Sequence, residues 1–488
     1  MKLYLYGHDY KYAAEQMLLT LFPAQRPEYP AGPPAPGEDA LVLSLHRGAV
    51  WATATAALSY GGREYRAARR CRTAELTDPL STDRALQRIL KLAFYDAGTA
   101  ARGGEPPWGA LTGVRPVKIP TKAMLAGASP AQAERLLRDT YRVTEGRRRL
   151  AMDCAGASLA ALRSLAPGEV SLYVGIPFCP TRCAYCSFVS QSVERSFALV
   201  PPYVDALCGE ISAGGEMVRR AGLRVRTFYM GGGTPTTLTA EQMDRVLTAF
   251  ETSFDRTACE EITVEAGRPD TITAEKLVVL RTHGVTRVSV NPQTFEENVL
   301  RAIGRCHTAA DIDRAMELVA RCGFPHVNMD LIAGLPEDTA EGLRQSLDRC
   351  LTYGPDDITV HTLALKKGSR ILTEGLRIPG AETVAEMLDY ASPTLRTAGY
   401  RPYYLYRQKY MSGSFENIGW CRPGTAGLYN IYMMEEMHSI VSLGGGAMTK
   451  INLPDGRLER FHNPKFPQQY LERIDDVLAQ KDAAFRLL

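Results

Sequence analysis

Three cysteines follow one another closely in the segment SLYVGIPFCPTRCAYCSF, residues 171–188. They are Cys179, Cys183 and Cys186, and their spacing is C-x3-C-x2-C. A four-iron cluster normally takes four thiolate ligands, so three closely spaced thiolates leave one iron without a protein ligand. An open iron can hold a substrate. The spacing therefore predicts an active site built around an iron–sulfur cluster.

Other interpretations of these cysteines stay open on the sequence alone. Structural zinc sites are closed by four ligands, commonly as C-x2-C pairs, and no second pair lies near this segment. Three buried cysteines could also simply pack. A disulfide is the weakest interpretation, because eleven cysteines dispersed along a chain without a secretory signal indicate reduced thiols.

The elements that position these cysteines can be predicted from hydrophobic patterns. Apolar residues 172–176 indicate a buried strand that ends at Pro177, which leaves the cysteines in the loop at its carboxyl end. Similar runs recur up to about residue 370, separated by helical stretches such as 240–254, 311–322 and 341–351. The predicted strands are Leu172 to Ile176, Thr227 to Met230, Glu261 to Glu265, Arg287 to Asn291, Val327 to Ile332 and Asp357 to Leu363.

Six βα units in a row predict an α/β fold with a curved parallel sheet, a partial (β/α)6 TIM-like barrel rather than the closed eight-stranded form. Such a fold places its chemistry at the carboxyl ends of the strands. Polar residues recur there: Glu265 ends the third strand, Gln293 follows the fourth and Asp330 lies in the fifth. A purely structural core would not need these side chains.

A glycine-rich turn, Gly231 to Thr234, follows the second strand. Glycines there let backbone amides and carbonyls approach a ligand. Such a turn is weak evidence alone, but its place one βα unit after the cysteines favours a ligand site.

These motifs together resemble the radical S-adenosylmethionine (SAM) superfamily. Within it, the lead-in Tyr173 to Cys179, the GGGTPTTL block Gly231 to Leu238 and the DLIAGLP block Asp330 to Pro336 resemble the oxygen-independent coproporphyrinogen III oxidase family. The segments Leu111 to Lys118 (LTGVRPVK) and Tyr403 to Trp420 are similar to its HemZ-type coproporphyrinogen dehydrogenases.

The resemblance implies a set of cofactor-binding residues. Cys179, Cys183 and Cys186 would hold a [4Fe-4S] cluster, and no catalytic residue is expected beyond these ligands. Arg305 can form a charge-assisted bond to the carboxylate of SAM. The remaining positions that match family contacts to SAM or the cluster are Tyr173, Gly232, Gly233, Thr234, Glu265, Gln293, Asp330, Ile332 and Ala364.

The reaction implied is a radical one. An electron from the reduced cluster splits SAM, and the resulting 5′-deoxyadenosyl radical removes a hydrogen atom from the substrate. On coproporphyrinogen III, loss of carbon dioxide from two propionates then gives the vinyl groups of protoporphyrinogen IX. The partners expected are therefore a tetrapyrrole substrate and a reduced electron donor such as flavodoxin or ferredoxin.

A tetracarboxylate substrate needs cationic side chains to hold it. The candidates are Lys366 and Lys367 after the sixth strand, and Arg401, Arg407 and Lys409 in a segment that also contains Tyr400, Tyr403, Tyr404, Tyr406 and Tyr410. His361 and His307 are weaker candidates for acids or ligands, because a histidine at a strand end often only satisfies a backbone group.

Two departures from the family pattern bear on the substrate. Gly175 stands where the best-studied oxidases have a histidine, and Phe188 stands where they have a further cysteine. A branch of the family with an aromatic at that second position consists of haem chaperones. A haem-delivery protein is therefore a second interpretation, with His438 or Cys421 as possible axial ligands. Another radical reaction, such as methyl transfer, is a third.

The whole chain divides on this evidence into three domains. Residues 1–165 form an α+β domain of unknown role, with strands near Ala40 to Leu45 and Val50 to Leu58 and helices near Asp83 to Ala97 and Ser129 to Tyr141. Residues 166–370 form the partial barrel. Residues 371–488 form a mixed C-terminal domain that covers the substrate, with a helix near Ala381 to Thr397.

Composition limits the classes of partner. The chain has 488 residues, 45% of them hydrophobic, and a net charge of +3, which gives no global argument for nucleic acid. The arginine cluster at 63, 66, 69, 70 and 72 is better interpreted as a solvated basic face than as an RNA site. We expect no nucleic-acid partner, no membrane span and, without a signal-peptide core, a cytoplasmic location.

Overall fold

The computed structural model describes residues 1–35, 37–186, 191–192, 196–366, 368–408, 411–453 and 456–487. The chain forms two compact units. The first contains Met1–Met152 together with Arg407–Phe415, and the second contains Asp153–Tyr406 together with Glu416–Leu488. The finer division into three domains stays a prediction.

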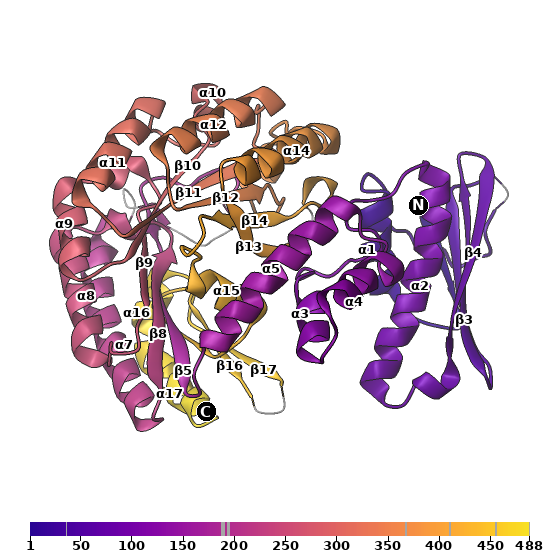
Figure 1. Ribbon diagram of the computed structural model, residues 1–488, viewed down its shortest axis with the longest axis horizontal. Coiled ribbons are helices and arrows are strands. Elements are labelled where there is room, and N and C mark those ends of the chain that lie inside the picture. The colour runs from indigo at the N-terminus through magenta and orange to yellow at the C-terminus, as the bar shows by residue number, and fades with distance from the viewer. Residues whose placement is uncertain are drawn as a thin grey trace. The chain divides into compact units, whose positions relative to one another are not determined.

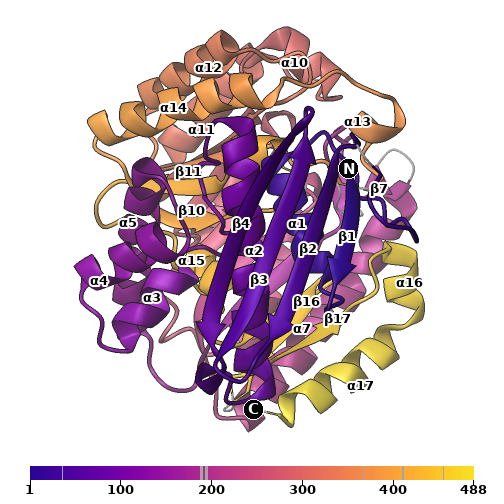
Figure 2. The ribbon, with the colours of Figure 1, turned by 90° about the vertical axis from the view of Figure 1, so that its right-hand side faces the viewer.

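The first unit is an α+β structure built on a four-stranded sheet in the order β1-β2-β3-β4. Figure 2 shows the strands side by side, with α1 and α2 behind them. Alternate residues of β3 (Ala52, Ala54, Ala56 and Leu58) are buried against these helices, as expected for a sheet with one covered face. The bounds are β1 Lys2–Tyr6, α1 Lys11–Leu21, β2 Ala40–Arg47, β3 Trp51–Tyr60, β4 Arg63–Arg72, α2 Pro79–Arg102, α3 Lys118–Leu125 and α4 Pro130–Arg135. Helix α5, Glu145–Ser164, begins in this unit and continues into the second.

The long helix α2 has clear sequence signals at both ends. Asp78 caps its N-terminus by accepting hydrogen bonds from the backbone N–H groups of Leu80 and Ser81, and Gly103 ends it in the left-handed conformation, with φ of 72°. The helix predicted over 129–141 also begins as expected, with Ser129 as its cap. From Leu136 to Thr140, however, it continues as a π-helical turn rather than as α-helix.

The arginine cluster lies on strand β4. Arg66 pairs with Glu64 at 2.8 Å, and Arg69 pairs with Asp96 of α2. Arg70 stacks on the ring of Trp51, 4.2 Å from its centroid. These contacts agree with a solvated basic face whose charges are partly satisfied within the unit.

The second unit contains the partial barrel. Six strands pair in parallel in the order in which they occur in the sequence, β5-β8-β9-β10-β11-β12. Figure 1 shows α7, α8, α9, α11 and α12 following one another along one side of this sheet. The strands are β5 Glu169–Ile176, β8 Arg224–Gly232, β9 Glu261–Glu265, β10 Arg287–Gln293, β11 His326–Ala333 and β12 Asp357–Thr362. The helices are α7 Val200–Arg220, α8 Ala240–Ser253, α9 Ala274–Thr282, α10 Glu297–Ala302, α11 Ala309–Cys322, α12 Ala340–Tyr353, α13 Arg370–Thr373 and α14 Ala381–Thr397.

The sequence signals that predict these βα units agree with the structure at individual residues. Thr239, Thr308 and Thr339 each accept a hydrogen bond from a backbone N–H in the first turn of the following helix, α8, α11 and α12 respectively. Strand β10 is buried along its whole length, as a central parallel strand covered on both faces should be. The predicted α/β fold with an incomplete barrel is therefore confirmed.

The C-terminal part extends the sheet at both edges. At one edge β14 pairs antiparallel with β12, and β13 pairs with β14. At the other, β15 lies parallel to β5, followed by antiparallel β16 and β17. The bounds are β13 Arg401–Tyr406, β14 Asn417–Cys421, α15 Leu428–Glu435, β15 Ile440–Leu443, β16 Met448–Asn452, β17 Leu458–His462, α16 Pro467–Glu472 and α17 Ile474–Phe485. None of the helices described is both long enough and apolar enough to cross a bilayer.

A buried ion pair fixes the turn that follows β15. Lys481 of α17 lies 3.0 Å from the carboxylate of Glu210 on α7, and both side chains are almost fully enclosed. The same carboxylate accepts hydrogen bonds from the backbone N–H of Gly444 (2.6 Å) and the hydroxyl of Tyr470 (2.6 Å). The pair therefore connects two helices to the backbone of the turn.

Replacing Lys481 by methionine should lower the free energy of unfolding by about 3–5 kcal/mol, because it leaves the buried Glu210 charge uncompensated. Arg486→Ala is the matched control, since Arg486, just beyond α17, forms an exposed pair with Asp482 whose loss should change the stability little. Thermal unfolding of the two variants measures the difference. A Lys481→Met protein as stable as the control would contradict this account of the turn.

Candidate active site

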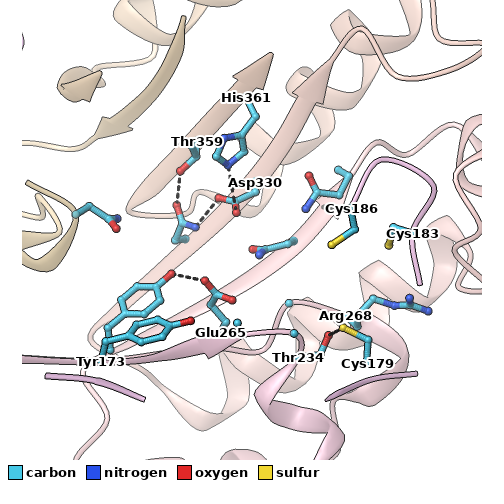
Figure 3. Close-up of a pocket in the computed structure, with 18 of the residues that line it drawn as sticks. Tyr173, Cys179, Cys183, Cys186, Thr234, Glu265, Arg268, Asp330, Thr359 and His361 are labelled. Carbon is cyan, nitrogen blue, oxygen red and sulfur yellow. Dashed lines mark hydrogen bonds and ion pairs between the residues drawn. The ribbon is translucent and has the colours of Figure 1, made fainter. Parts of the chain in front are cut away.

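A cavity of about 490 Å³ opens at the carboxyl ends of the parallel strands, in the second unit. All three cysteines of the C-x3-C-x2-C segment line it. Figure 3 shows them on one side of the cavity, with Thr234 and Arg268, while Asp330, Thr359, His361 and Glu265 lie across from them. The sequence-predicted residues that the structure brings together here are Tyr173, Cys179, Cys183, Cys186, Gly232, Gly233, Thr234, Glu265, Gln293, Arg305 and Asp330.

The cysteine loop is held in place by the barrel. Ala184 donates its backbone N–H to Ile303 at 2.8 Å, and Cys186 donates to the carbonyl of Cys183 at 3.1 Å. The hydroxyl of Thr234, in the glycine turn, donates to the sulfur of Cys179 at 3.5 Å. Hydrogen bonds to cysteine sulfur stabilise the thiolate and tune the potential of a cluster that it binds.

Electrostatics favour the thiolate at Cys183. Burial would raise the pKa of this thiol, but the guanidinium groups of Arg305 and Arg268 outweigh that effect, and its pKa is lowered. Arg305 is itself buried and also donates to the hydroxyl of Tyr185 at 3.2 Å and to the carbonyl of Asn291. A deprotonated thiol is the form that binds metal.

The donor set fits a cluster better than a single metal ion. Among the described residues, no three His, Cys, Asp or Glu side chains converge closely enough to coordinate one ion. A cluster differs from an ion because each thiolate binds a separate iron atom, so its ligands need not converge on one point. The three cysteines of this cavity match that requirement.

The glycine turn is fastened to the end of β5. The backbone N–H of Gly233 donates to Ile176 at 2.8 Å, and that of Thr234 donates to Phe178 at 2.8 Å. A Cβ atom at Gly233 would lie 2.4 Å from the carbonyl oxygen of Phe178. This position therefore requires glycine, and the turn leaves its backbone at the cavity wall.

Glu265 ends β9 inside the cavity. The hydroxyl of Tyr229 donates to its carboxylate at 2.5 Å, and the rings of Tyr229, Tyr173 and Tyr429 stack on one another pairwise. Burial, reinforced by the nearby carboxylate of Asp330, raises the pKa of Glu265 to about 7, although the bond from Tyr229 opposes the shift. Glu265 can thus change its charge near neutral pH, which suits a group that meets a cationic ligand.

This raised pKa predicts how stability depends on pH. Between about pH 4.5 and 7 the folded protein keeps the Glu265 proton that the unfolded chain releases, so the folded state loses stability as the pH rises. Glu265→Gln removes this effect, and its stability relative to wild type should improve by up to about 3 kcal/mol between pH 5 and pH 8. Thermal unfolding at both pH values measures this, with exposed Glu241→Gln as control. A difference that does not change with pH would contradict the prediction.

Asp330 behaves in the opposite way. Burial would raise its pKa, but His361, whose Nε2 lies 3.6 Å from the carboxylate, and the amide of Asn328, which donates at 2.8 Å, lower it overall. The carboxylate therefore stays ionised in the cavity. It can accept hydrogen bonds from hydroxyl groups of a ligand.

Unsatisfied polar atoms mark two further positions. Among the described residues, the side-chain oxygen of Gln293 and the Nε of Arg305 are buried without a hydrogen-bond partner. Gln293 also has φ of 69°, in the left-handed region, at the point where the pairing of β10 with β11 shifts register. Buried unpaired groups and local backbone strain are costly, and both are typical of ligand sites. A cofactor with donors and a carboxylate would satisfy them.

Other sequence-predicted residues lie elsewhere. Ile332 is buried beside Ala184, under the cysteine loop, and Ala364 and the exposed Lys366 follow β12; none of the three lines the cavity. His307 lies 3.7 Å from Asp270, outside the cavity lining. The positions 188, 367, 409 and 410 lie outside the described residues.

Two of the cationic residues predicted to contact the substrate lie outside the cavity lining. Arg401 donates to the carbonyls of Arg396 and Tyr400, and Arg407 is buried and donates to the carbonyls of Leu111 and Ser414. Neither lines the cavity, because backbone carbonyls take up both guanidinium groups.

The haem ligands considered for the second interpretation also lie away from the cavity. His438 is buried against the hydroxyl of Ser171 at 2.7 Å, and burial lowers its pKa to about 3. Cys421 is buried at the end of β14. Neither side chain lines the cavity.

Sequence reasoning missed several residues of the site. Arg268 lies three residues after Glu265, in the loop that follows β9, and its guanidinium binds Asp270 through two hydrogen bonds of 2.9 and 2.8 Å. Because Arg268 follows the predicted end of the third strand, the sequence pattern could have identified it as a candidate site residue. The other missed lining residues include Tyr185, Tyr229, Asn291, Asn328, Thr359, Tyr429, Asn430, Met433 and Met434.

Comparison with known proteins agrees with this geometry. The profile of the radical SAM superfamily matches residues 173–350. The oxygen-independent coproporphyrinogen-III oxidase-like protein HemZ of Bacillus subtilis (strain 168) is 40% identical over 402 residues, which are 81% of this chain and 80% of that protein. The heme chaperone HemW of Escherichia coli (strain K12) is 28% identical over 317 residues, 64% of this chain and 79% of that protein.

A solved structure confirms the shared fold. The coproporphyrinogen III oxidase HemN of Escherichia coli superposes with a TM-score of 0.52 at 24% identity, over 66% of this chain and 72% of that one. Members of the superfamily bind a [4Fe-4S] cluster and SAM. The chain therefore belongs to the radical SAM superfamily, in the family of the oxygen-independent coproporphyrinogen III oxidases and their HemZ-like relatives.

Proposed function

We propose that this protein is a radical SAM oxidoreductase that decarboxylates propionate side chains of coproporphyrinogen III to vinyl groups without oxygen, giving protoporphyrinogen IX. The observation that carries the proposal is the single cavity that unites the three cysteines with the glycine turn, Glu265, Arg305 and Asp330. The name of the 40% identical relative supports the choice of substrate.

Bound in this cavity, a reduced four-iron cluster and SAM would supply the radical chemistry that removes a hydrogen atom from a propionate; loss of carbon dioxide and transfer of one electron to an acceptor would then give the vinyl group. The protein's own residues bind the cluster and SAM and orient them toward the substrate. Cys179, Cys183 and Cys186 hold the cluster, and Arg305 offers a guanidinium to a carboxylate. The contacts proposed for SAM or the cluster are Tyr173, Gly232, Gly233, Thr234, Glu265, Gln293, Arg305 and Asp330, which line the cavity, and, on the family resemblance alone, Ile332 and Ala364, which do not.

The wall opposite the cysteines suits a tetrapyrrole. Tyr404 and Tyr406 of β13 line it, together with Tyr429, Met433 and Met434 of α15. Aromatic rings and thioethers pack well against a flat apolar macrocycle and exclude water from it. The partners proposed are thus the tetrapyrrole and a reduced one-electron donor such as flavodoxin or ferredoxin. An oxygen-sensitive cluster suits a reducing compartment, and we propose the cytoplasm.

Haem delivery is the second candidate function. It is favoured by the similarity to HemW, which is named a heme chaperone, and by Gly175. A Cβ atom at Gly175 would lie 3.0 Å from the carbonyl oxygen of Gly445, so this backbone leaves little room for the histidine of the oxidases. Thioethers of Met433, Met434 or Met448, which line the cavity, would then be candidates for haem iron ligands.

An anaerobic assay distinguishes the two functions. The reconstituted protein is incubated with SAM and a reductant, with and without coproporphyrinogen III, and 5′-deoxyadenosine and vinyl-bearing porphyrinogen are measured together. Formation of both only when coproporphyrinogen III is present supports the decarboxylation. Slow SAM cleavage that ignores the porphyrinogen, combined with stoichiometric haem binding, would favour haem delivery instead.

A further inference from the structure

A second cavity lies wholly within the first unit and plays no part in the proposed reaction. It has a volume of about 430 Å³ and is enclosed by α2, the loop of the LTGVRPVK segment, the start of α3 and Tyr141. Figure 1 shows α2 along one face of the four-stranded sheet. The cavity is as large as typical small-molecule sites.

The charge of this cavity is entirely positive. Arg84, Arg88 and Lys91 line it from α2, and Arg115 lines it from the loop, whereas the described lining includes no Asp or Glu. The three residues of α2 are spaced four and three positions apart, so they form one stripe along the helix. Like charges at this spacing destabilise a helix. Asp83, on the same helix, accepts a hydrogen bond from Gln87 at 2.7 Å.

Lys91 is the most informative of these cations. Its ammonium group is half-buried and donates to the hydroxyl of Thr112 at 3.0 Å. Burial lowers its pKa, and no carboxylate opposes that effect. Neither Arg84 nor Arg88 has an ion-pair partner among the residues that the structure describes. An ammonium withdrawn from water without a counterion is costly, which is the condition that a bound anion relieves.

The loop across from α2 is held rigidly. The carbonyl oxygen of Leu111 accepts from Arg407, and the carbonyl of Val114 accepts from the backbone N–H of Arg407. The ring of Trp108 stacks on the same guanidinium, 5.7 Å from its centroid. The loop is therefore preorganised, and a ligand that binds there need not order it.

We infer that this cavity binds a polyphosphorylated small molecule of nucleotide size. From Arg84 to Lys91 the helix rises about 10 Å, which suits two or three linked phosphates rather than one carboxylate. Arginine recognises phosphate through paired hydrogen bonds. Leu92, Ile119 and the ring of Tyr141 supply an apolar wall for the organic part of the ligand.

Calorimetry of the full-length protein with inorganic tripolyphosphate and with ATP tests the inference. Arg88→Ala and Lys91→Met should each weaken binding about 10- to 100-fold, as expected for the loss of a charge-assisted hydrogen bond. Arg102→Ala, in the exposed last turn of the same helix, should leave it unchanged. An equal loss in Arg102→Ala would reveal diffuse surface attraction and overturn the inference.

Thermal unfolding provides a second test that does not depend on the calorimetric titrations. Lys91→Met should raise the thermal transition of the protein without ligand, because it removes a half-buried charge that no carboxylate among the described residues neutralises, and should reduce the further rise that tripolyphosphate gives to wild type. A lower transition without ligand would overturn this account of Lys91. Displacement of tripolyphosphate by single-stranded RNA at equal phosphate concentration would also overturn the small-molecule site and indicate a nucleic-acid surface.

Discussion

Replacing Cys183 by alanine is expected to abolish SAM cleavage, with or without a tetrapyrrole. Cys183 is the most deeply buried of the three cysteines, and it is the thiol whose pKa Arg305 and Arg268 lower. Without it, two thiolates remain, and two iron atoms of a four-iron cluster would lack a protein ligand. Iron and sulfide content, the visible absorption of the reconstituted protein, and 5′-deoxyadenosine formation measure the effect.

Cys322→Ala is the matched control, because Cys322 ends α11 in the same unit and does not line the cavity. It should assemble the cluster and cleave SAM as wild type does. A Cys183→Ala protein that keeps four irons and cleaves SAM would disprove the ligand assignment. Because the assay without porphyrinogen is included, the result does not depend on the proposed substrate.

The second large effect is expected at Arg305. Its guanidinium lies between Cys183, the hydroxyl of Tyr185 and the carbonyl of Asn291, and its Nε is buried without a partner in the part of the chain that the structure describes. Arg305→Met should weaken SAM binding by about 2–5 kcal/mol, or roughly 30- to 5000-fold, as truncation of a buried charged contact does. Equilibrium binding of SAM to the reconstituted variant measures this.

The same substitution should act on Cys183 in the protein without a cluster. Removing the cation raises the pKa of the thiol, so alkylation of Cys183 should require a higher pH than in wild type. Arg301→Met, an exposed site on α10, is the control for both measurements. If Arg305→Met weakened SAM binding but left the alkylation profile unchanged, Arg305 would contact the cofactor without acting on the cysteine.

The sequence was sufficient for the parts of the site that local chemistry determines. The strand predicted over 261–265 matches β9, and this places Glu265 at its end, in the cavity. Gln293 was expected after the fourth strand. It is instead the last residue of β10 with positive φ, because a register shift lengthens the pairing with β11. Periodicity locates strands but carries no information on such irregularities.

The parts that could not be predicted depend on residues far apart in the chain. Tyr229 and Tyr429 stack with ring centroids 4.5 Å apart because α15 returns to the cavity. The sequence alone could not assign the tyrosines near residue 400 either to the site or to the core, and the structure places them in both. Tyr404 and Tyr406, two positions apart on β13, line the cavity, whereas Tyr400 and Tyr403 are buried elsewhere. Arg407 could not be placed, since one of the carbonyls that hold its guanidinium belongs to Leu111, almost 300 positions earlier.

The parallel pairing of β15 with β5 has a consequence for the synthesis of this protein. Residues 171–174 leave the ribosome long before residues 440–443, which form the strand that pairs with their outer edge. Until those residues emerge, the nascent chain carries an apolar strand with unpaired backbone groups next to the cysteine loop. A chain that has not reached residue 440 therefore has an open, aggregation-prone edge, and synthesis of residues 440–443 protects the strand that leads into the cysteine loop.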